Sequence, residues 1–353
     1  MEITLTFHNT PLQCYSELDD TFDNYENINK VLKRLNLYLQ DILRSYKIDL
    51  NISLLVADSV SLSPATILRD SIFYVAFPAK LFSYFKERIA KIYSIPEFQK
   101  YFNFKEECMD QYIVRTFDWI CNCALLHEIF HIVNGHLKYK LEIQKNQNKV
   151  STKIKNYNLE FQTMEFDADY NASVKMAKDL ISIVHNPDMR KNYSASYLLQ
   201  YILDDFIFLN VALCISFSTF QDNKSLKNGD YLSIDHPIEA IRYSYATEIL
   251  INEFLKSFNG IISSTKLISK ISEITIACNR IYYADNKFSD SLVCSAYSEQ
   301  AVKHKMLVHN NWNNIYKTLN KYAYVELFEK EELTELSYWV DEDKNILPIA
   351  FKI

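Results

Sequence analysis

The sequence predicts an α+β fold, with a small sheet near the start of the chain and helices through most of the remainder. Two observations carry this prediction. Short runs of alternating, β-branched or aromatic residues occur within the first 80 residues. Longer apolar runs, of the length and composition of buried or amphipathic helices, follow through most of the rest of the sequence.

The first part of the chain holds the predicted strands. A short strand is expected at the N-terminus, followed by an amphipathic helix near residues 28–46. Residues 49–56 alternate apolar and polar side chains, and residues 71–77 are β-branched and aromatic, so both are predicted strands. The second strand ends at a proline, and residues 79–93 then have the pattern of a helix.

Residues 127–131 have the sequence His-Glu-Ile-Phe-His, an HExxH motif. On a helix, positions i and i+4 lie about 40° apart around the axis, so His127 and His131 can direct two imidazoles at one metal ion. Glu128 lies beside them, where a general base is needed. This is the ligand layout of a zinc peptidase, and it predicts Zn²⁺ as the cofactor.

Apolar residues flank the motif, as expected for a helix buried in a core. This helix is expected to begin near Gln111 and to end at Asn134–Gly135, because glycine is favoured at a left-handed C-cap. His136 follows directly. We interpret it as a polar residue just past the cap rather than as a third ligand, because the metzincin spacing places glycine and histidine elsewhere and Leu137 occupies that histidine position.

A catalytic zinc site has three protein ligands and an open position for water, so a third ligand is needed. The best candidate lies in the segment 164–172, Met-Glu-Phe-Asp-Ala-Asp-Tyr-Asn-Ala. Glu165 and Asp169 share one helix face at i and i+4. Glu165 could complete a His2Glu set, and Asp169 could accept the second ring N–H of a ligand histidine. The alternative is an acidic helix that faces solvent.

The run HEIFHIVNGH followed by EFDAD resembles the gluzincin metallopeptidases, especially the HtpX-like group and its soluble relatives, whose second motif is ExxxD. The segment 235–242, DHPIEAIR, resembles the His-Pro segment of that group. The resemblance covers roughly residues 48–258 and implies a zincin-like core, a small mixed sheet with an active-site helix. It also implies that His236 stabilises the tetrahedral intermediate and that Arg242 is a structural or charge-pairing residue. A helix-capping His-Pro turn is the alternative.

The implied activity is hydrolysis of a peptide bond by a metal-activated water, with Glu128 as base and then as acid. The oxyanion would be held by zinc together with His236 or a nearby tyrosine. Such peptidases bind an extended substrate along an edge strand, and residues 71–77 are the candidate for it. An ordinary core strand is equally compatible with that sequence.

A weaker resemblance links the chain to the phage-exclusion Lit-type peptidases of bacteria, which cleave a cytosolic host protein. It implies a bacterial toxin or phage-defence protease with a protein or peptide substrate, and we expect an activating partner or substrate. Two alternatives stay open at this point. One is a catalytically inactive zincin-fold scaffold or binding protein, and the other is an HExxH run that occurs by coincidence in a helical protein.

Composition limits the other classes. The net charge is −6 and is spread without long runs of one sign, which argues against a nucleic-acid-binding protein with the usual basic face. A small basic patch is compatible with this composition. Seven cysteines without a CxxC pair are typical of reduced thiols in the cytosol, so a cytoplasmic location is expected. The N-terminus lacks the pattern of a signal peptide. Residues 197–220 are strongly apolar, but Asp204 and Asp205 in the middle favour a buried helix over a membrane span.

The expected organisation is a metallopeptidase core at residues 1–260 and a helical C-terminal extension at 261–353, which can pack as one unit with the core. Residues 138–158 are rich in lysine, asparagine and glutamine. They are predicted to form a connection, either a mobile loop over the cleft or a solvated spacer.

Overall fold

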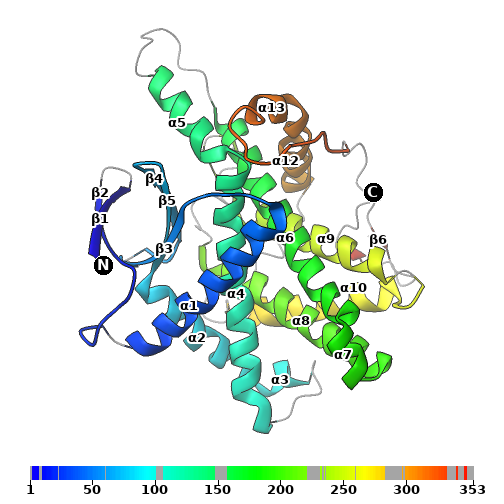
Figure 1. Ribbon diagram of the computed structural model, residues 1–353. Coiled ribbons are helices and arrows are strands. Elements are labelled where there is room, and N and C mark those ends of the chain that lie inside the picture. Colours follow the sequence, from blue (N-terminus) through cyan, green and yellow to red (C-terminus); the bar gives the residue numbers. More distant parts are fainter. Residues whose placement is uncertain are drawn as a thin grey trace. The chain divides into compact units, whose positions relative to one another are not determined.

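The computed structural model describes residues 2–7, 10–22, 24–59, 61–100, 106–147, 157–220, 231–232, 234, 236–258, 260–282, 296, 299–331, 339–340 and 346–347. Within them the fold is mixed α/β and mostly helical, with one small five-stranded mixed sheet (Figure 1). The predicted small mixed sheet and helical remainder are therefore confirmed.

The chain forms two compact units, and both are discontinuous in sequence. Unit 1 comprises residues 1–87, 124–157 and 313–329, and unit 2 comprises residues 88–123, 158–312 and 330–353. Helices α2 (Ala79–Tyr93) and α4 (Met109–Val133) each contribute residues to both units. The predicted division of the chain at residue 260 stays a prediction.

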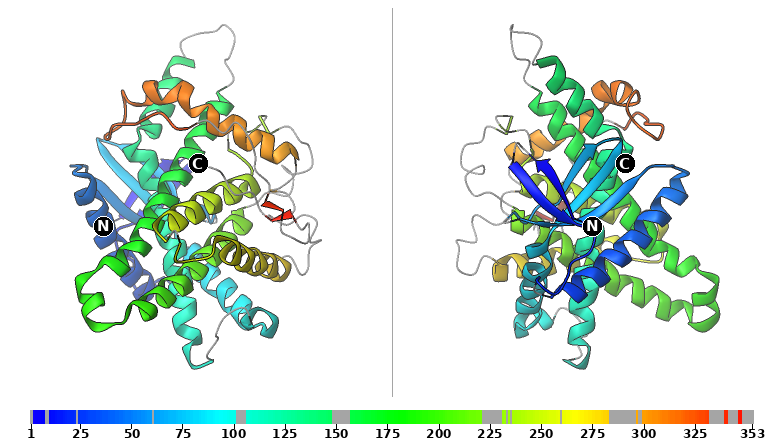
Figure 2. Two further views of the ribbon diagram at one scale, coloured as in Figure 1. Left: turned by 90° about the vertical axis from the view of Figure 1, so that its right-hand side faces the viewer. Right: turned by 60° about the vertical axis from the view of Figure 1, so that its left-hand side comes forward.

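Unit 1 contains the sheet. Its strands are β1 (Glu2–Phe7), β2 (Thr10–Tyr15), β3 (Ile52–Asp58), β4 (Ala65–Arg69) and β5 (Ile72–Pro78), in the spatial order β1-β2-β3-β5-β4. β3 and β5 pair in parallel, and the other neighbours pair antiparallel. The sheet curls, so that Arg69 donates a hydrogen bond to the carbonyl of Thr4, 2.9 Å away (Figure 2).

The strand predicted at residues 71–77 is confirmed, but its predicted place at the sheet edge is wrong. β5 lies between β3 and β4, and β4 is the edge strand. β4 precedes β5 in the sequence, and a turn at Asp70 and Ser71 joins the two strands. The φ angles of these residues, 51° and 64°, are those of a tight two-residue hairpin. This hairpin covers the edge of β5 that a peptide would otherwise use.

Helix α1 (Tyr25–Tyr46) packs against β3 with an apolar face that includes Leu35 and Leu39. Helix α13 (Trp312–Leu319) lies almost wholly in unit 1. Helix α5 (His136–Gln147) covers residues 138–147 of the segment that was predicted to be a connection. That prediction is wrong for residues 138–147, and residues 148–156 lie outside the described part of the chain.

Unit 2 is built around α6 (Asn158–His185), α8 (Ala195–Phe220) and α9 (Glu239–Ser257), which contact one another. Further helical elements belong to the same unit. They are α3 (Pro96–Gln99), η1 (Glu106–Cys108), α7 (Pro187–Asn192), α10 (Ser264–Tyr282) and α12 (Glu299–Asn310). The short strands β6 (Trp339–Val340) and β7 (Ile346–Leu347) pair with each other.

Helix α8 is long and apolar enough to cross a membrane by length and composition, and 72% of its most apolar window is buried inside the structure. Asp205 in its middle is buried and forms an ion pair with Arg115 of α4 at 2.5 Å. Arg115 also lies over the ring of Tyr201. The helix thus has the burial expected for a core helix, as its two acidic residues predicted.

Candidate metal centre

Helix α4 presents the HExxH residues as the motif predicts. The helix is apolar on most sides and ends where expected, because Gly135 adopts a φ of 77° at the C-cap. The Nε2 atoms of His127 and His131 lie 3.0 Å apart, and their ring centroids are 4.6 Å apart. Two imidazole nitrogens from successive turns therefore converge on one point.

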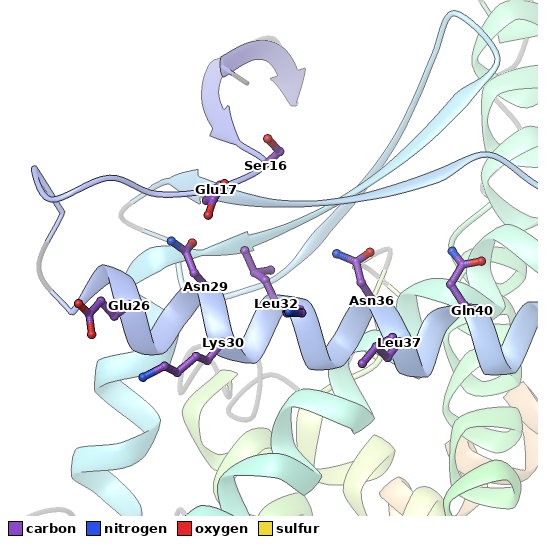
Figure 3. A pocket seen from close by; sticks show the side chains of 10 residues that line it. Ser16, Glu17, Glu26, Asn29, Lys30, Leu32, Asn36, Leu37 and Gln40 are labelled. Carbon is purple, nitrogen blue, oxygen red and sulfur yellow. The ribbon is translucent and has the colours of Figure 1, made fainter.

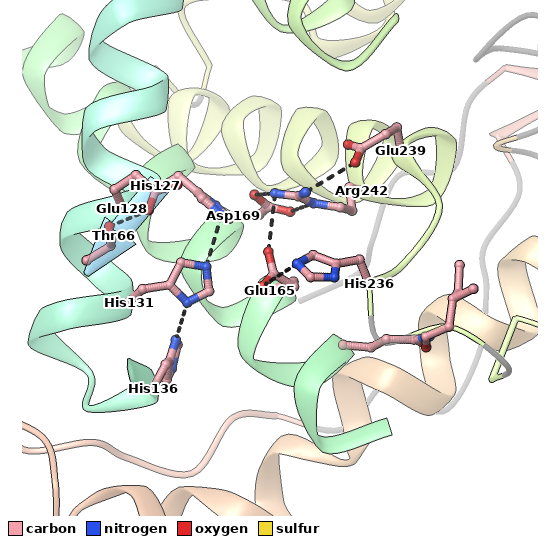
Figure 4. A network of polar contacts seen from close by, with 12 residues as sticks. Thr66, His127, Glu128, His131, His136, Glu165, Asp169, His236, Glu239 and Arg242 are labelled. Atoms are coloured by element: carbon pink, nitrogen blue, oxygen red, sulfur yellow. Dashed lines mark hydrogen bonds and ion pairs between the residues drawn. The ribbon is translucent and has the colours of Figure 1, made fainter. Parts of the chain in front are cut away.

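Glu128 faces the edge strand of the sheet. The hydroxyl of Thr66, on β4, donates a hydrogen bond to Oε2 of Glu128 (Figure 4). Both residues belong to unit 1. The carboxylate next to the histidine pair is thus held by the outermost strand, which is the place where an extended peptide could add to the sheet.

His136, on the other side of the glycine turn, is fully buried. Its Nδ1 lies 3.0 Å from Nδ1 of His131, and the two rings meet edge to face with centroids 5.1 Å apart. The interpretation of His136 as a polar residue just past the helix end misses this contact. It required knowing that Gly135 turns the chain so that α5 begins at residue 136.

The second motif lies on α6 in unit 2, and it is buried. The side chains of Glu165 and Asp169 are 4% exposed, which excludes an acidic helix face directed to solvent. Arg242 of α9 donates two hydrogen bonds to Asp169, at 2.8 and 2.9 Å, and lies 3.8 Å from Glu165 and 3.4 Å from Glu239. Three carboxylates therefore surround one guanidinium (Figure 4).

His236 lies next to the same cluster. Its Nε2 is 3.5 Å from Oε1 of Glu165, and 52% of its side chain is exposed. The backbone before it is held by Gln162, one turn before Glu165 on α6, whose amide donates to the carbonyls of Tyr231 and Ile234 at 2.5 and 2.8 Å. Helix α9 begins two residues after the proline of the His-Pro pair, close to the helix start at the proline that the resemblance implies.

Charge and burial shape the cluster around Arg242. Burial alone would lower the pKa of Arg242, but the charges of Asp169 and Glu239 outweigh it and raise that pKa well above its usual value. Burial raises the pKa of the Glu239 carboxyl, and the charge of Arg242 opposes that rise. The guanidinium therefore stays charged and organises the carboxylates around it.

Cys123 of helix α4 lies within electrostatic range of this cluster in unit 2. Burial raises the pKa of its thiol to about 12, and the charges of Asp169 and Arg242 also act on it. His127 lies one turn further along the same continuous helix, on nearly the same face.

The ligand atoms of His127, His131 and Glu165 all lie within 4.8 Å of one another, and this group could hold a metal ion. Two imidazoles and one carboxylate suit zinc and several other divalent ions. Around Arg242, three carboxyl groups face one guanidinium, which favours an added cation as well. The residues present therefore fit the predicted three-ligand metal site.

Other predicted positions can now be assigned to the structure. The predicted hydrogen bond from a ligand histidine to Asp169 stays a prediction, whereas the predicted charge pairing of Arg242 is present. Asp167, between the two motif acids, is buried on another face of α6 and pairs with Lys330 at 2.7 Å. Thr66 and Gln162 carried no recognisable signal in the sequence, because their roles depend on tertiary contacts.

A pocket of about 480 Å³ lies elsewhere in unit 1, between the end of β2 and α1 (Figure 3). Glu17, Asn29 and Lys33 are among its lining residues, and none of the ten residues that line it belongs to the metal centre. Leu32 and Leu37 also line it, so its wall is both polar and apolar.

Comparison of the chain with protein-family models, curated proteins and solved structures gives no match. The functional argument therefore depends on the geometry and chemistry of the residues themselves.

Proposed function

We propose that this chain is a zinc-dependent endopeptidase of the gluzincin type, which acts on a protein or peptide in the cytoplasm. The observation that carries the proposal is the convergence of His127, His131 and the buried Glu165, with Glu128 next to the histidine pair. A metal-binding scaffold would need the three ligands but would have no chemical need for the additional carboxylate.

The roles of the chain's residues follow from that geometry. When bound, zinc would supply Lewis-acid chemistry and make a water molecule acidic enough to act near neutral pH. Glu128 would take the proton from the attacking water and later transfer it to the leaving amine. Thr66 holds one carboxylate oxygen of Glu128 and so orients the other for that proton.

His236 would assist at the carbonyl. It lies beside Glu165 with about half of its side chain exposed, so it can donate a hydrogen bond to the oxygen on which negative charge develops. Removing one such donor typically costs about 3–4 kcal/mol of transition-state stabilisation. Asp169 and Arg242 would fix the carboxylate of Glu165 from behind.

The substrate would bind as an additional strand. Among the described residues, β4 forms a ladder only with β5, and its end at Arg69 lies against β1, so an extended peptide would add to the edge of β4 beside Thr66. Thr66 lies on this strand and contacts Glu128, which would place the scissile bond next to the general base. This replaces residues 71–77 as the proposed substrate strand.

Comparison of the wild type with Glu128→Gln tests the proposal. Both proteins should bind one zinc per chain, whereas His127→Ala should not. Proteome-wide N-terminal labelling of bacteria that express each form should show new N-termini only with the wild type. Glu87→Gln, on an exposed face of α2, is the matched control and should behave like the wild type.

The two alternatives give different results. Zinc binding with identical labelling in the wild type and Glu128→Gln would leave a binding scaffold in place of a peptidase. Absence of bound zinc in the wild type would refute the metal centre itself. Growth arrest by the wild type but not by Glu128→Gln would support a role as a toxin or phage-defence protease.

A further inference from the structure

The third histidine of the segment His127-Glu-Ile-Phe-His131-Ile-Val-Asn-Gly-His136 is buried without being in the metal-ligand group. It is the first residue of α5, directly after the glycine turn. A fully buried imidazole next to a ligand of the proposed metal centre needs a physical explanation, because burying a polar ring is unfavourable unless it is hydrogen-bonded.

The geometry around His131 separates a ligand from a supporting role. Nε2 of His131 lies 3.0 Å from Nε2 of His127, whereas Nδ1 of His131 lies 3.0 Å from Nδ1 of His136. The two nitrogens are on different edges of one imidazole ring. His136 therefore contacts the edge of His131 that is turned away from the other ligand histidine, and it cannot share the metal with both.

The proton between the two rings has two arrangements. If Nδ1 of His131 carries it, that N–H donates to Nδ1 of His136, and Nε2 of His131 keeps its lone pair for a metal ion. If Nδ1 of His136 carries it, Nδ1 of His131 accepts, and the neutral His131 ring has its proton on Nε2, where the lone pair is required. Only the first arrangement is compatible with metal binding.

The backbone holds His136 in this place. Gly135 has a φ of 77°, and a Cβ there would lie only 2.5 Å from the backbone carbon of Tyr322. The N–H of Tyr324 donates to the carbonyl of Val133 at 2.8 Å, which fastens the segment after α13 to the end of α4. The turn is thus packed on its outer side, which fixes the place of His136 at the start of α5.

We propose that His136 is a positioning residue of the metal centre, which accepts a hydrogen bond from Nδ1–H of His131 and thereby fixes the metal-binding tautomer of that ligand. The proposal rests on the metal centre described under the proposed function. Metal-bound histidines usually donate their second N–H to a carboxylate, a carbonyl or water. A neutral imidazole here gives the same orientation without adding a negative charge to the site.

The test is zinc affinity of the purified full chain, measured by competition with a chelating indicator. His136→Leu removes the acceptor at similar volume and should weaken zinc binding about 10–100-fold. His136→Asn places an amide oxygen near the position of Nδ1 and should restore affinity to within about threefold of the wild type. His309→Leu is the control. It removes a buried histidine of unit 2, whereas His136 belongs to unit 1, and it should leave the zinc affinity unchanged.

Three results would overturn the proposal. Wild-type affinity in His136→Leu, with zinc binding lost in His127→Ala, would refute the role of His136 and leave the metal centre intact. Equal losses in the leucine and asparagine variants would show that the acceptor is not what matters. Absence of zinc binding in the wild type would refute both proposals together.

A second measurement does not depend on how well the variants fold. Long-range ¹⁵N–¹H spectra of the histidine rings in the zinc-loaded wild type report which nitrogen carries the proton. We expect His131 to carry it on Nδ1 and His136 on Nε2. A proton on Nδ1 of His136 would overturn the proposal.

Discussion

Substitution of Gly135 by alanine should lower the free energy of unfolding much more than substitution of Gly260 by alanine. Both glycines adopt left-handed backbone conformations, with φ angles of 77° and 76°. The added Cβ at residue 260 would meet nothing within 4 Å, whereas at residue 135 it would lie 2.5–2.8 Å from atoms of Tyr322 and Ala323. The pair therefore separates backbone strain from steric overlap.

The magnitudes follow from these two contributions. Alanine in the left-handed region costs about 1–2 kcal/mol, and this applies to both variants. The loss of unfolded-state entropy on replacing glycine is also common to both and cancels in the comparison. Overlap in a packed region adds about 1–3 kcal/mol, and it applies only at residue 135, because the atoms in the way are mostly backbone.

Urea unfolding of both full-length variants, followed by circular dichroism, measures this difference. Native-state hydrogen exchange adds a local readout, since the amide of Tyr324 is bonded to Val133 beside the turn. We expect that amide to lose protection in Gly135→Ala and to keep it in Gly260→Ala. Equal free energies of unfolding in the two variants would refute the argument from steric overlap.

Three further predictions concern buried charges of unit 2. Arg242→Met should lower the free energy of unfolding by about 3–5 kcal/mol, measured in urea at pH 7, because it leaves carboxylates buried without their guanidinium. Lys305→Met should destabilise strongly at pH 8 and weakly at pH 5. Glu248, its buried partner at 2.8 Å, has a pKa raised by burial to about 7 from 4.5, so it can take up a proton at the lower pH. His309 has a pKa lowered by burial to about 4 from 6.5, so the wild type should lose stability as the pH falls from 6.5 to 4, and His309→Gln should lose less.

The sequence was sufficient for features that depend on local patterns. The HExxH spacing predicted the convergence of His127 and His131, because a helix alone sets that geometry. The glycine after the motif predicted the end of α4, since a left-handed C-cap is a local backbone property. The second motif predicted that Glu165 and Asp169 share one helix face, because an i, i+4 relation is a property of one helix, and Arg242 contacts both.

Features that depend on tertiary pairing were not predictable. The strand at residues 71–77 was recognised, but its place inside the sheet follows from the short strand β4, which has little pattern of its own. Residues 138–147 have the composition of a loop, yet they form α5, which contacts β4. Composition reflects preference in isolation, and packing outweighs it here.

The charge arrangement in unit 2 supports a cation site independently of the histidine motif. Glu165, Asp169 and Glu239 are grouped around the single guanidinium of Arg242, and all four side chains are at most 15% exposed. Burial raises the pKa of the Glu239 carboxyl, and the charge of Arg242 opposes that rise. One guanidinium therefore faces three carboxyl groups, which outnumber the cations within this group. A buried charge of this kind is costly unless a cation accompanies it. Glu165 lies 3.8 Å from Arg242, farther than Asp169 at 2.8 Å. Glu165 is also one of the three candidate metal ligands. A cation bound there would therefore balance the cluster as well as complete the histidine pair.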